Sequence, residues 1–312
     1  MKLPASSAVI TPVKTDRPLL LLLILSLCIA SDVSADVPAK TDRAQLAAAR
    51  ALFETTGKSA EAQVAFEKIA AADPQNADAQ NYLAQLALRQ GDADKALAYA
   101  EKAAELSPND ADVQNTLGDC AGNAAQKASL FRQPGLAKKC VAAYERAVAL
   151  APEKIEYHED LLQFYRQAPG IVGGGMDKAL AEAATIKKLD ALRGRLAFAG
   201  LYTAEKKYDL AFAEFDEVLK TSPDDYAALY QLGKLAAMTS QQLDRGLAAL
   251  RRTLDLPVPT APNTPSHAAA QWRLGQILEK KNDPAGARAA YEAALTLDRK
   301  FSPAADSLKK LK

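Results

Sequence analysis

The sequence repeats one short pattern in three places: Ala96–Ala103 reads ALAYAEKA, Ala211–Val218 reads AFAEFDEV and Ala287–Ala294 reads ARAAYEAA. Each copy begins with a small residue and has a second apolar residue four positions later, so the two share one face of a helix. A short break and a new helical pattern follow each copy. Such recurrence indicates a row of similar helical units rather than a domain with a single core.

The same pattern extends to seven copies when it is followed along the chain. Successive first positions are 34, 44, 39, 32, 35 and 41 residues apart. Proline recurs twelve residues after the first position in four copies, where it punctuates the unit because it cannot continue a helix. The small first positions are Ala62, Ala96, Cys140, Ala179, Ala211, Gly246 and Ala287, and the residues four positions later are Phe66, Ala100, Tyr144, Ala183, Phe215, Leu250 and Tyr291.

This pattern resembles the tetratricopeptide-repeat (TPR) family, whose 34-residue unit is a helix–turn–helix. The resemblance implies an all-α, right-handed superhelical solenoid of about seven repeats. A capping helix over 302–311 would follow the last repeat, and residues 36–42 would form a short linker before the first. The expected units are 43–76, 77–110, 111–154, 155–191, 192–225, 226–266 and 267–300.

The composition of the chain agrees with a wholly helical fold. The sequence is rich in Ala, Leu, Lys, Glu and Gln, which are strong helix formers. Runs of β-branched and aromatic residues, which mark strands, are almost absent. The 312 residues would suggest two average domains, but a repeat protein escapes that estimate because its core grows in one dimension.

The first 35 residues have the anatomy of a secretory signal peptide. Three basic residues precede an apolar stretch, Leu19–Ala30, which is too short to cross a membrane. Val33 and Ala35 fit the small-residue requirement of a cleavage site, so we expect cleavage after Ala35 and a periplasmic location. An uncleaved anchor and a lipoprotein at Cys28 are the alternatives, although bulky Leu27 disfavours the second.

The mature chain would carry no net charge, because 36 basic and 36 acidic residues remain after residue 35. Nucleic-acid binding needs a basic face, so we expect no nucleic-acid partner. No second long apolar run occurs in the sequence. We therefore expect no membrane insertion once the signal peptide has been removed.

Residue patterns for catalysis are missing, and we expect neither an enzyme nor a cofactor, and no metal site. The two histidines, His158 and His267, are far apart in the repeat, and no nucleophile elbow occurs. Gly173–Gly175 lacks the strand and the Gly-Lys of a nucleotide loop, which favours a long turn. Cys120 and Cys140 are twenty residues apart. Export would allow them a disulfide, while their repeat positions would equally suit buried thiols.

The resemblance also implies where a ligand would bind. In this family the inner, concave groove is lined by the first helix of each unit, at positions 2, 5, 9, 12 and 13. We expect an acidic, amide-rich first half and a second half in which Tyr230 and Trp272 present exposed rings to a peptide. The alternative is that these faces are simply solvated. The predicted binding residues are Asn81, Gln85, Arg89, Asn115, Asp119, Glu159, Gln163, Arg166, Tyr230, Lys234, Trp272 and Gln276.

These observations predict a non-enzymatic adaptor or assembly factor of the cell envelope that binds a protein or peptide through the groove. TPR co-chaperones that grip carboxylates need cations where this chain has Glu156 and Asp160, which excludes that ligand class. The alternative function is a small-molecule receptor serving an envelope transporter. It would require a closed pocket under the insertions at 122–136 and 168–175.

Overall fold

The computed structural model describes residues 43–261 and 264–311, which form fifteen α-helices and one short 3₁₀ helix, with no strand among them. The all-α prediction is confirmed. The predicted signal peptide and the predicted linker, residues 36–42, lie outside the described residues. None of the described helices combines the length and apolar character needed to cross a bilayer.

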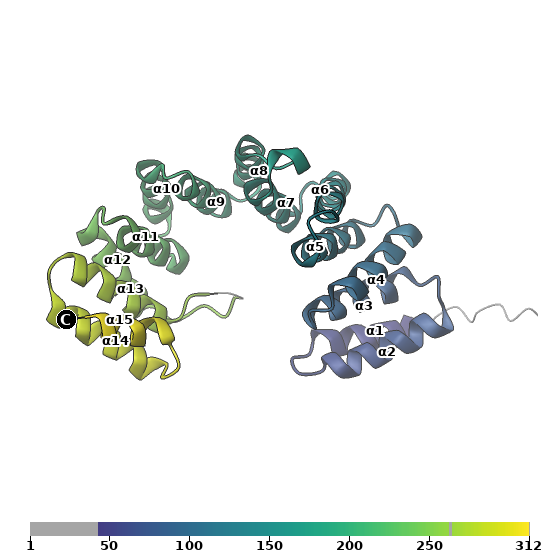
Figure 1. Cartoon of the computed structure of the whole chain (residues 1–312), viewed down its shortest axis with the longest axis horizontal. Helices are drawn as coiled ribbons and strands as arrows, with labels where there is room; N and C mark the ends of the chain where they lie inside the picture. The colour runs from purple at the N-terminus through teal and green to yellow at the C-terminus, as the bar shows by residue number, and fades with distance from the viewer. Residues whose placement is uncertain (1–42, 262–263, 312) are drawn as a thin grey trace, which may run out of the picture. The chain divides into compact units, whose positions relative to one another are not determined.

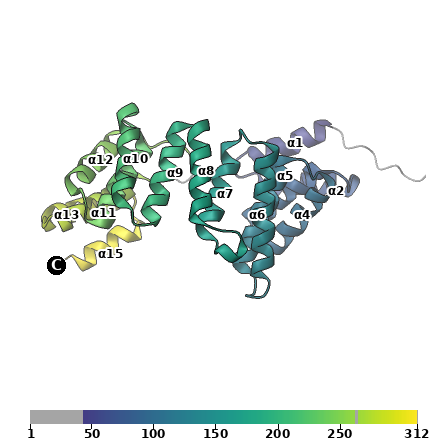
Figure 2. The same cartoon turned by 90° about the horizontal axis from the view of Figure 1, so that it is seen from above.

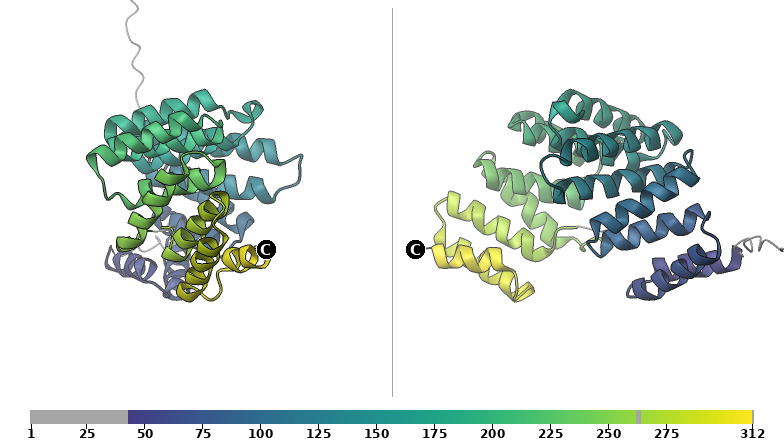
Figure 3. Two further views of the ribbon diagram at one scale, coloured as in Figure 1. Left: turned by 90° about the vertical axis from the view of Figure 1, so that its left-hand side faces the viewer. Right: turned by 45° about the vertical axis from the view of Figure 1, so that its right-hand side comes forward.

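The first fourteen helices form seven consecutive pairs, and α15 packs against the last of them (Figure 1 and Figure 3). Within each pair the two helices pack together, and each pair then packs on the next. The predicted row of seven helix–turn–helix units with a terminal helix is confirmed. The helices are α1 (Arg43–Glu54), α2 (Ser59–Ala72), α3 (Ala77–Arg89), α4 (Ala93–Leu106), α5 (Ala111–Lys127), α6 (Gln133–Leu150), α7 (Ile155–Gln167), α8 (Met176–Leu189), α9 (Ala191–Ala204), α10 (Tyr208–Thr221), α11 (Tyr226–Thr239), α12 (Leu243–Asp255), α13 (His267–Lys280), α14 (Pro284–Leu297) and α15 (Ser302–Lys310).

The core follows the repeat register read from the sequence. All fourteen residues at the two recurring positions are buried. Glycine on the first helix of a unit allows the second helix to approach closely, since a Cβ atom on Gly118 would lie 2.4 Å from the Tyr144 ring. Gly275 stands in the same relation to Tyr291, also at 2.4 Å. These contacts repeat the same interlocking of small and large residues at different points of the chain.

Short polar side chains start seven of the helices by accepting a hydrogen bond from a backbone N–H of the first turn, which would otherwise lack a partner. Asp190 is the one residue between α8 and α9, and its carboxylate accepts from the Arg193 N–H at 2.9 Å. The residues that cap in this way are Asn76, Asp92, Asp110, Asp190, Asp225, Ser266 and Asp283.

The two insertions take different forms. Most of the extra residues around 122–136 lengthen α5 and α6 to 17 and 18 residues. Only residues 128–132 form a turn between the two helices. The second insertion forms the 3₁₀ helix η1 (Gly170–Val172), which connects α7 to α8. Gly173–Gly175 therefore belongs to a turn between helices, in agreement with the prediction.

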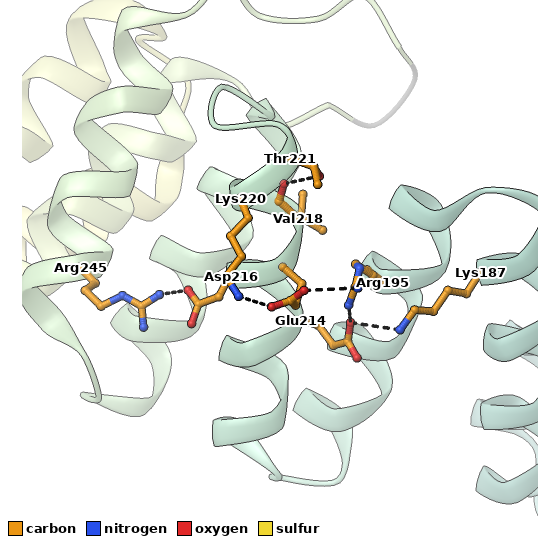
Figure 4. Close-up of polar contacts among 9 residues, drawn as sticks. Lys187, Arg195, Glu214, Asp216, Val218, Lys220, Thr221 and Arg245 are labelled. Carbon is orange, nitrogen blue, oxygen red and sulfur yellow. Dashed lines mark hydrogen bonds and ion pairs between the residues drawn. The ribbon is translucent and has the colours of Figure 1, made fainter.

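Ion pairs link successive units between α8 and α12 (Figure 4). Arg195 Nη1 contacts Glu214 Oε2 at 2.9 Å, and Lys187 Nζ contacts the same carboxylate at 3.8 Å. Further along, Arg245 on α12 pairs with Asp216 on α10. Most of these side chains are partly exposed, so each pair contributes about 0–1 kcal/mol.

Candidate functional site

The first helices of the first three pairs, α1, α3 and α5, line a polar depression of about 560 Å³. We call it the N-terminal groove. It lies on the face on which the repeat register places ligand-binding residues. Five of the predicted binding residues line it, namely Asn81, Gln85, Arg89, Asn115 and Asp119.

Two asparagines of this groove are one repeat apart and share one structural feature. Asn81 on α3 is only 6% exposed, and its Oδ1 atom accepts no hydrogen bond from the described protein. Asn115 lies 34 residues later on α5; its Nδ2 donates to Asp160 at 3.0 Å, while its Oδ1 also has no partner there. An unpaired buried acceptor costs about 1–3 kcal/mol. Both oxygens are therefore buried acceptors without a partner among the described residues.

Carboxylates outnumber cations around the groove. Of the two arginines that line it, Arg50 pairs with Asp78 at 2.8 Å, and the guanidinium of Arg89 stacks 3.9 Å from the centre of the Phe53 ring. The surplus of negative charge in a partly buried depression favours a positively charged ligand. The lining carboxylates belong to Glu54, Asp78, Asp110, Asp112 and Asp119.

Asp119 has the carboxyl group with the largest shift in this groove. Burial raises its pKa to about 6, and the nearby negative charge of Asp160 acts in the same direction. The Tyr144 hydroxyl donates to Asp119 Oδ1 at 2.7 Å, which opposes the increase by stabilising the carboxylate. The charge of the groove therefore changes in the mildly acidic pH range.

A second depression, of about 390 Å³, lies between α7 and α9 and is lined by the predicted residues Glu159, Gln163 and Arg166. Glu159 is already engaged there, since Arg193 Nε and Nη2 contact its two oxygens at 2.9 and 2.6 Å. The third Arg193 nitrogen donates to Glu156 at 2.8 Å. This bidentate contact joins the fourth and fifth units, so Glu159 has less capacity for a ligand than Asn81 or Asn115.

Arg166 also lines a third depression, of about 340 Å³, together with Lys234 of α11. Burial lowers the pKa of Lys234, and the charge of Arg273 lowers it further. Arg166 and Lys234 thus bring two basic side chains to this depression. Their role in binding stays a prediction.

The expectation of two exposed aromatic rings is wrong. Tyr230 is buried among α9 to α13, with 6% of its surface exposed. Trp272 is half-buried: its Nε1 donates to Ser307 Oγ of α15 at 3.0 Å, and its ring meets Phe301 edge-on at 6.0 Å. The last unit has no following repeat, and α15 covers Trp272 instead. Gln276, beside it, accepts from Arg273 at 2.9 Å.

Cys120 and Cys140 are both buried, and the structure has them as free thiols. Burial raises the pKa of each to about 12, so neither is a reactive thiolate at neutral pH. His158 is buried too, with its ring nitrogens bonded to Glu182 and to the Pro152 carbonyl at 2.6 and 2.9 Å. These groups have structural surroundings rather than those of a catalytic site.

The residues of the N-terminal groove that sequence reasoning missed include Arg50, Phe53 and Tyr82. Tyr82 stacks on Phe66 with ring centres 4.6 Å apart and meets Phe53 edge-on at 4.9 Å. One signal could have found Arg50. It occupies the repeat position that holds Ala84, Gly118, Gly233 or Gly275 in other units. A residue as large as arginine cannot lie in the close contact that these small residues make with the second helix of their unit.

The comparisons with known proteins agree with this architecture. Two family models, each described as tetratricopeptide repeat, match residues 55–120 and 235–305. No curated protein matches the chain.

Similar solved structures include a tetratricopeptide repeat protein from Parabacteroides merdae, with 17% identity, a TM-score of 0.60, and coverage of 85% of this chain and 96% of that one. Yeast Tom70 shares 15% identity with a TM-score of 0.62, over 88% of this chain and 58% of its own. The human IFIT1 dimer with m7Gppp-AAAA has 18% sequence identity and a TM-score of 0.56. The match covers 86% of this chain and 61% of the IFIT1 chain. At these identities the likeness concerns the fold alone. With seven helix pairs in one register and both family matches inside them, the chain is a tetratricopeptide-repeat protein.

Proposed function

We propose that this protein is an exported, non-enzymatic adaptor or assembly factor of the cell envelope that binds an extended, basic segment of a partner protein in the N-terminal groove. Protein binding is the role that tetratricopeptide repeats suggest in general. The observation that carries the specific proposal is the pair of unpartnered asparagine oxygens on Asn81 and Asn115.

An extended peptide presents backbone N–H groups along its length, and asparagine side chains at equivalent positions of adjacent helices can accept from them. The amide oxygens supply no charge selectivity, which the surrounding carboxylates provide. A Lys or Arg side chain of the ligand would approach Glu54 or Asp119, which both line the groove; Asp112 is already paired with Lys154 at 2.6 Å. The ligand would thus be selected by its charge and held by its backbone.

Peptide binding gives a direct test. We expect the mature chain to bind members of a peptide array in proportion to their Lys and Arg content. Asn81→Ala combined with Asn115→Ala should weaken the best peptide by tenfold or more, measured by calorimetry, because two acceptors are lost. Gln75→Ala, on the turn before α3, is the matched control and should bind normally. Equal binding by the double variant would remove the basis of the proposal.

Export is a separate part of the proposal and rests on the sequence of residues 1–35. We expect the protein in the periplasmic fraction to begin at Asp36, since Val33 and Ala35 provide the small residues of the cleavage site. Amino-terminal sequencing after fractionation measures this. An intact Met1 form in the cytosol would contradict it.

The geometry favours the groove over the small-molecule alternative. That function requires an enclosed pocket at the insertions, and a depression of about 410 Å³ is found there. Its lining includes exposed residues such as Pro134, Pro169 and Ile171, so it lies open at the surface. A small ligand usually has most of its surface buried in its site.

A further inference from the structure

The turn between α5 and α6 displays two large apolar side chains in water. Leu130 and Phe131 are 79% and 98% exposed. Ser129 and Arg132 close the turn around them, because the Ser129 carbonyl accepts from the Arg132 N–H at 2.9 Å and from the Gln133 N–H at 3.1 Å. The two apolar residues are thus held at the tip by a hydrogen-bonded backbone.

The second insertion has the same construction. The Pro169 carbonyl accepts from the N–H groups of Val172 and Gly174 at 3.1 and 3.2 Å. Ile171 lies between these bonded residues, within the turn. Val172 is buried, whereas Ile171 is 85% exposed. Leu130, Phe131 and Ile171 are the three most exposed large hydrophobic residues of the described chain. All three belong to segments that depart from the regular repeat.

Both insertions lie at one edge of the stack. The end of α5, the start of α6 and residues 168–172 line one apolar depression, and η1 contacts α6. The turn before α6 lies at the same side of the helices as the turn before α8 (Figure 2). We call this surface the insertion edge and define it by Leu130, Phe131, Ile171 and the cations described next.

The insertion edge is basic. Residues 126–139 contain Lys127, Arg132, Lys138 and Lys139 and no acidic residue. Lys139 pairs with Glu101 and Lys127 donates to the Gly91 carbonyl at 2.6 Å, whereas Arg132 and Lys138 form no ion pair with the described residues.

The nearest acidic residues do not cancel this charge. Asp92 and Asp94, at the start of α4, line a depression together with Lys127 and Arg132. Four cations against these two carboxylates and Glu101, the partner of Lys139, leave the edge with a net charge of +1.

We propose that the insertion edge docks the protein on the surface of an anionic lipid bilayer, with Leu130, Phe131 and Ile171 entering the interface. An anionic membrane surface binds apolar side chains that lie next to cations. The apolar side chains enter the boundary of the hydrocarbon region, and the anionic headgroups attract the cations. This contact is adsorption to one leaflet, and it requires none of the described helices to span the membrane. It is independent of the N-terminal groove.

Two features favour a bilayer over a protein partner. Phe131 does not line the apolar depression. It therefore extends from the edge and does not contribute to a pocket that could bind a side chain of a partner protein. The Ser129 carbonyl at the tip also accepts two backbone hydrogen bonds, so it is not left unpaired when the tip enters the headgroup region.

Vesicle sedimentation tests the proposal with the mature full chain. We expect binding to vesicles of phosphatidylglycerol and phosphatidylcholine, weaker binding in high salt, and little binding to phosphatidylcholine alone. Leu130→Ser with Phe131→Ser should reduce the partition coefficient by tenfold or more. Arg132→Gln and Lys138→Gln should each reduce it about fivefold.

Matched controls separate these effects from general changes. Val64→Ser removes an apolar side chain that is 67% exposed on α2, and Lys309→Gln removes an exposed cation on α15; both should bind vesicles like the wild type. All substituted residues are exposed or at a turn tip, and circular dichroism should show unchanged melting. The proposal is overturned if the wild type fails to bind anionic vesicles at low salt, or if the Leu130/Phe131 variant binds as well as the wild type. It is also overturned if the wild type binds no vesicles while the Leu130/Phe131 variant loses the binding of a protein partner.

Discussion

Asp119 shows how a single residue connects the core of one unit with the surface of the groove. Its carboxylate accepts from Tyr144, which fills the space beside Gly118, and it also lines the N-terminal groove. Burial of this carboxyl favours its neutral form. Packing of the third unit is thereby coupled to pH.

The stability of the fold should depend on the protonation of Asp119. Its pKa is about 6 in the folded chain against an ordinary value of 3.8, so the folded chain binds the proton more tightly between these values. The free energy of unfolding should therefore decrease as pH rises through this range. Asp119→Asn should remove that decrease and raise the free energy of unfolding above pH 6, by at most about 3 kcal/mol.

Urea unfolding of both proteins at pH 4, 5, 6 and 7 measures the effect as a difference between variant and wild type. Asp160→Asn is a useful companion, because burial also raises the pKa of that carboxyl. A parallel pH dependence of wild type and Asp119→Asn would show that this carboxyl does not titrate in the expected range.

At the scale of the helix pair, the close contact of glycine with a large side chain determines how near the two helices lie. A Cβ atom on Gly118 would meet the Tyr144 ring at 2.4 Å, whereas one on Gly200 of α9 would meet no atom within 4 Å. Both glycines lie inside helices. The two positions thus differ in packing and share the backbone cost of glycine.

Gly118→Ala and Gly200→Ala should change stability in opposite directions. The first should lower the free energy of unfolding by about 1–3 kcal/mol because it overpacks the α5–α6 contact. The second should raise it by about 0.5–1 kcal/mol because alanine is the better helix former. Thermal unfolding followed by circular dichroism measures both. Equal shifts for the two variants would mean that the Gly118 contact is not limiting.

The sequence predicted this level of structure well, because the register depends on contacts within one unit. Ala96 and Ala100, Cys140 and Tyr144 all occupy the buried positions that their spacing indicated. Asn81 and Asn115 could be placed in the groove for the same reason, since they follow the regular 34-residue spacing. Local periodicity was enough for both.

Tyr230 and Trp272 could not be predicted in the same way, because their exposure depends on the neighbouring unit. Position 5 of the first helix is open only where the next helix leaves it open. Tyr230 is buried in a core cluster that continues into the following unit, and Trp272 lies under α15, whose path the repeat pattern does not specify. The repeat pattern reports contacts within one unit, and it does not report contacts between units.

For the whole molecule, the order of the helices means that each unit is stabilised chiefly by its neighbours. Trp272→Ala should therefore release α15 from α13 and lower the stability of the last units by about 3 kcal/mol. Protection against hydrogen exchange should fall in α13 to α15 and remain unchanged in α1 to α6.

Mass spectrometry of the exchanged protein resolves these segments. Trp272→Phe is the matched control, because it keeps an aromatic ring beside Phe301 and loses the bond to Ser307. It should lose less protection than the alanine variant. A uniform loss along the chain would mean that the array unfolds as one unit.

The single residue between α8 and α9 limits how far this chain can be treated as a set of exchangeable modules. Asp190 ends one helix and caps the next, and the backbone of Gly194 is so close to Lys187 that an added Cβ would lie 2.2 Å from its Cα. Grafting a foreign repeat at this joint would bring in side chains that the corner cannot accommodate. Chimeric arrays should therefore keep α8 and α9 together as one building block and place their seams elsewhere.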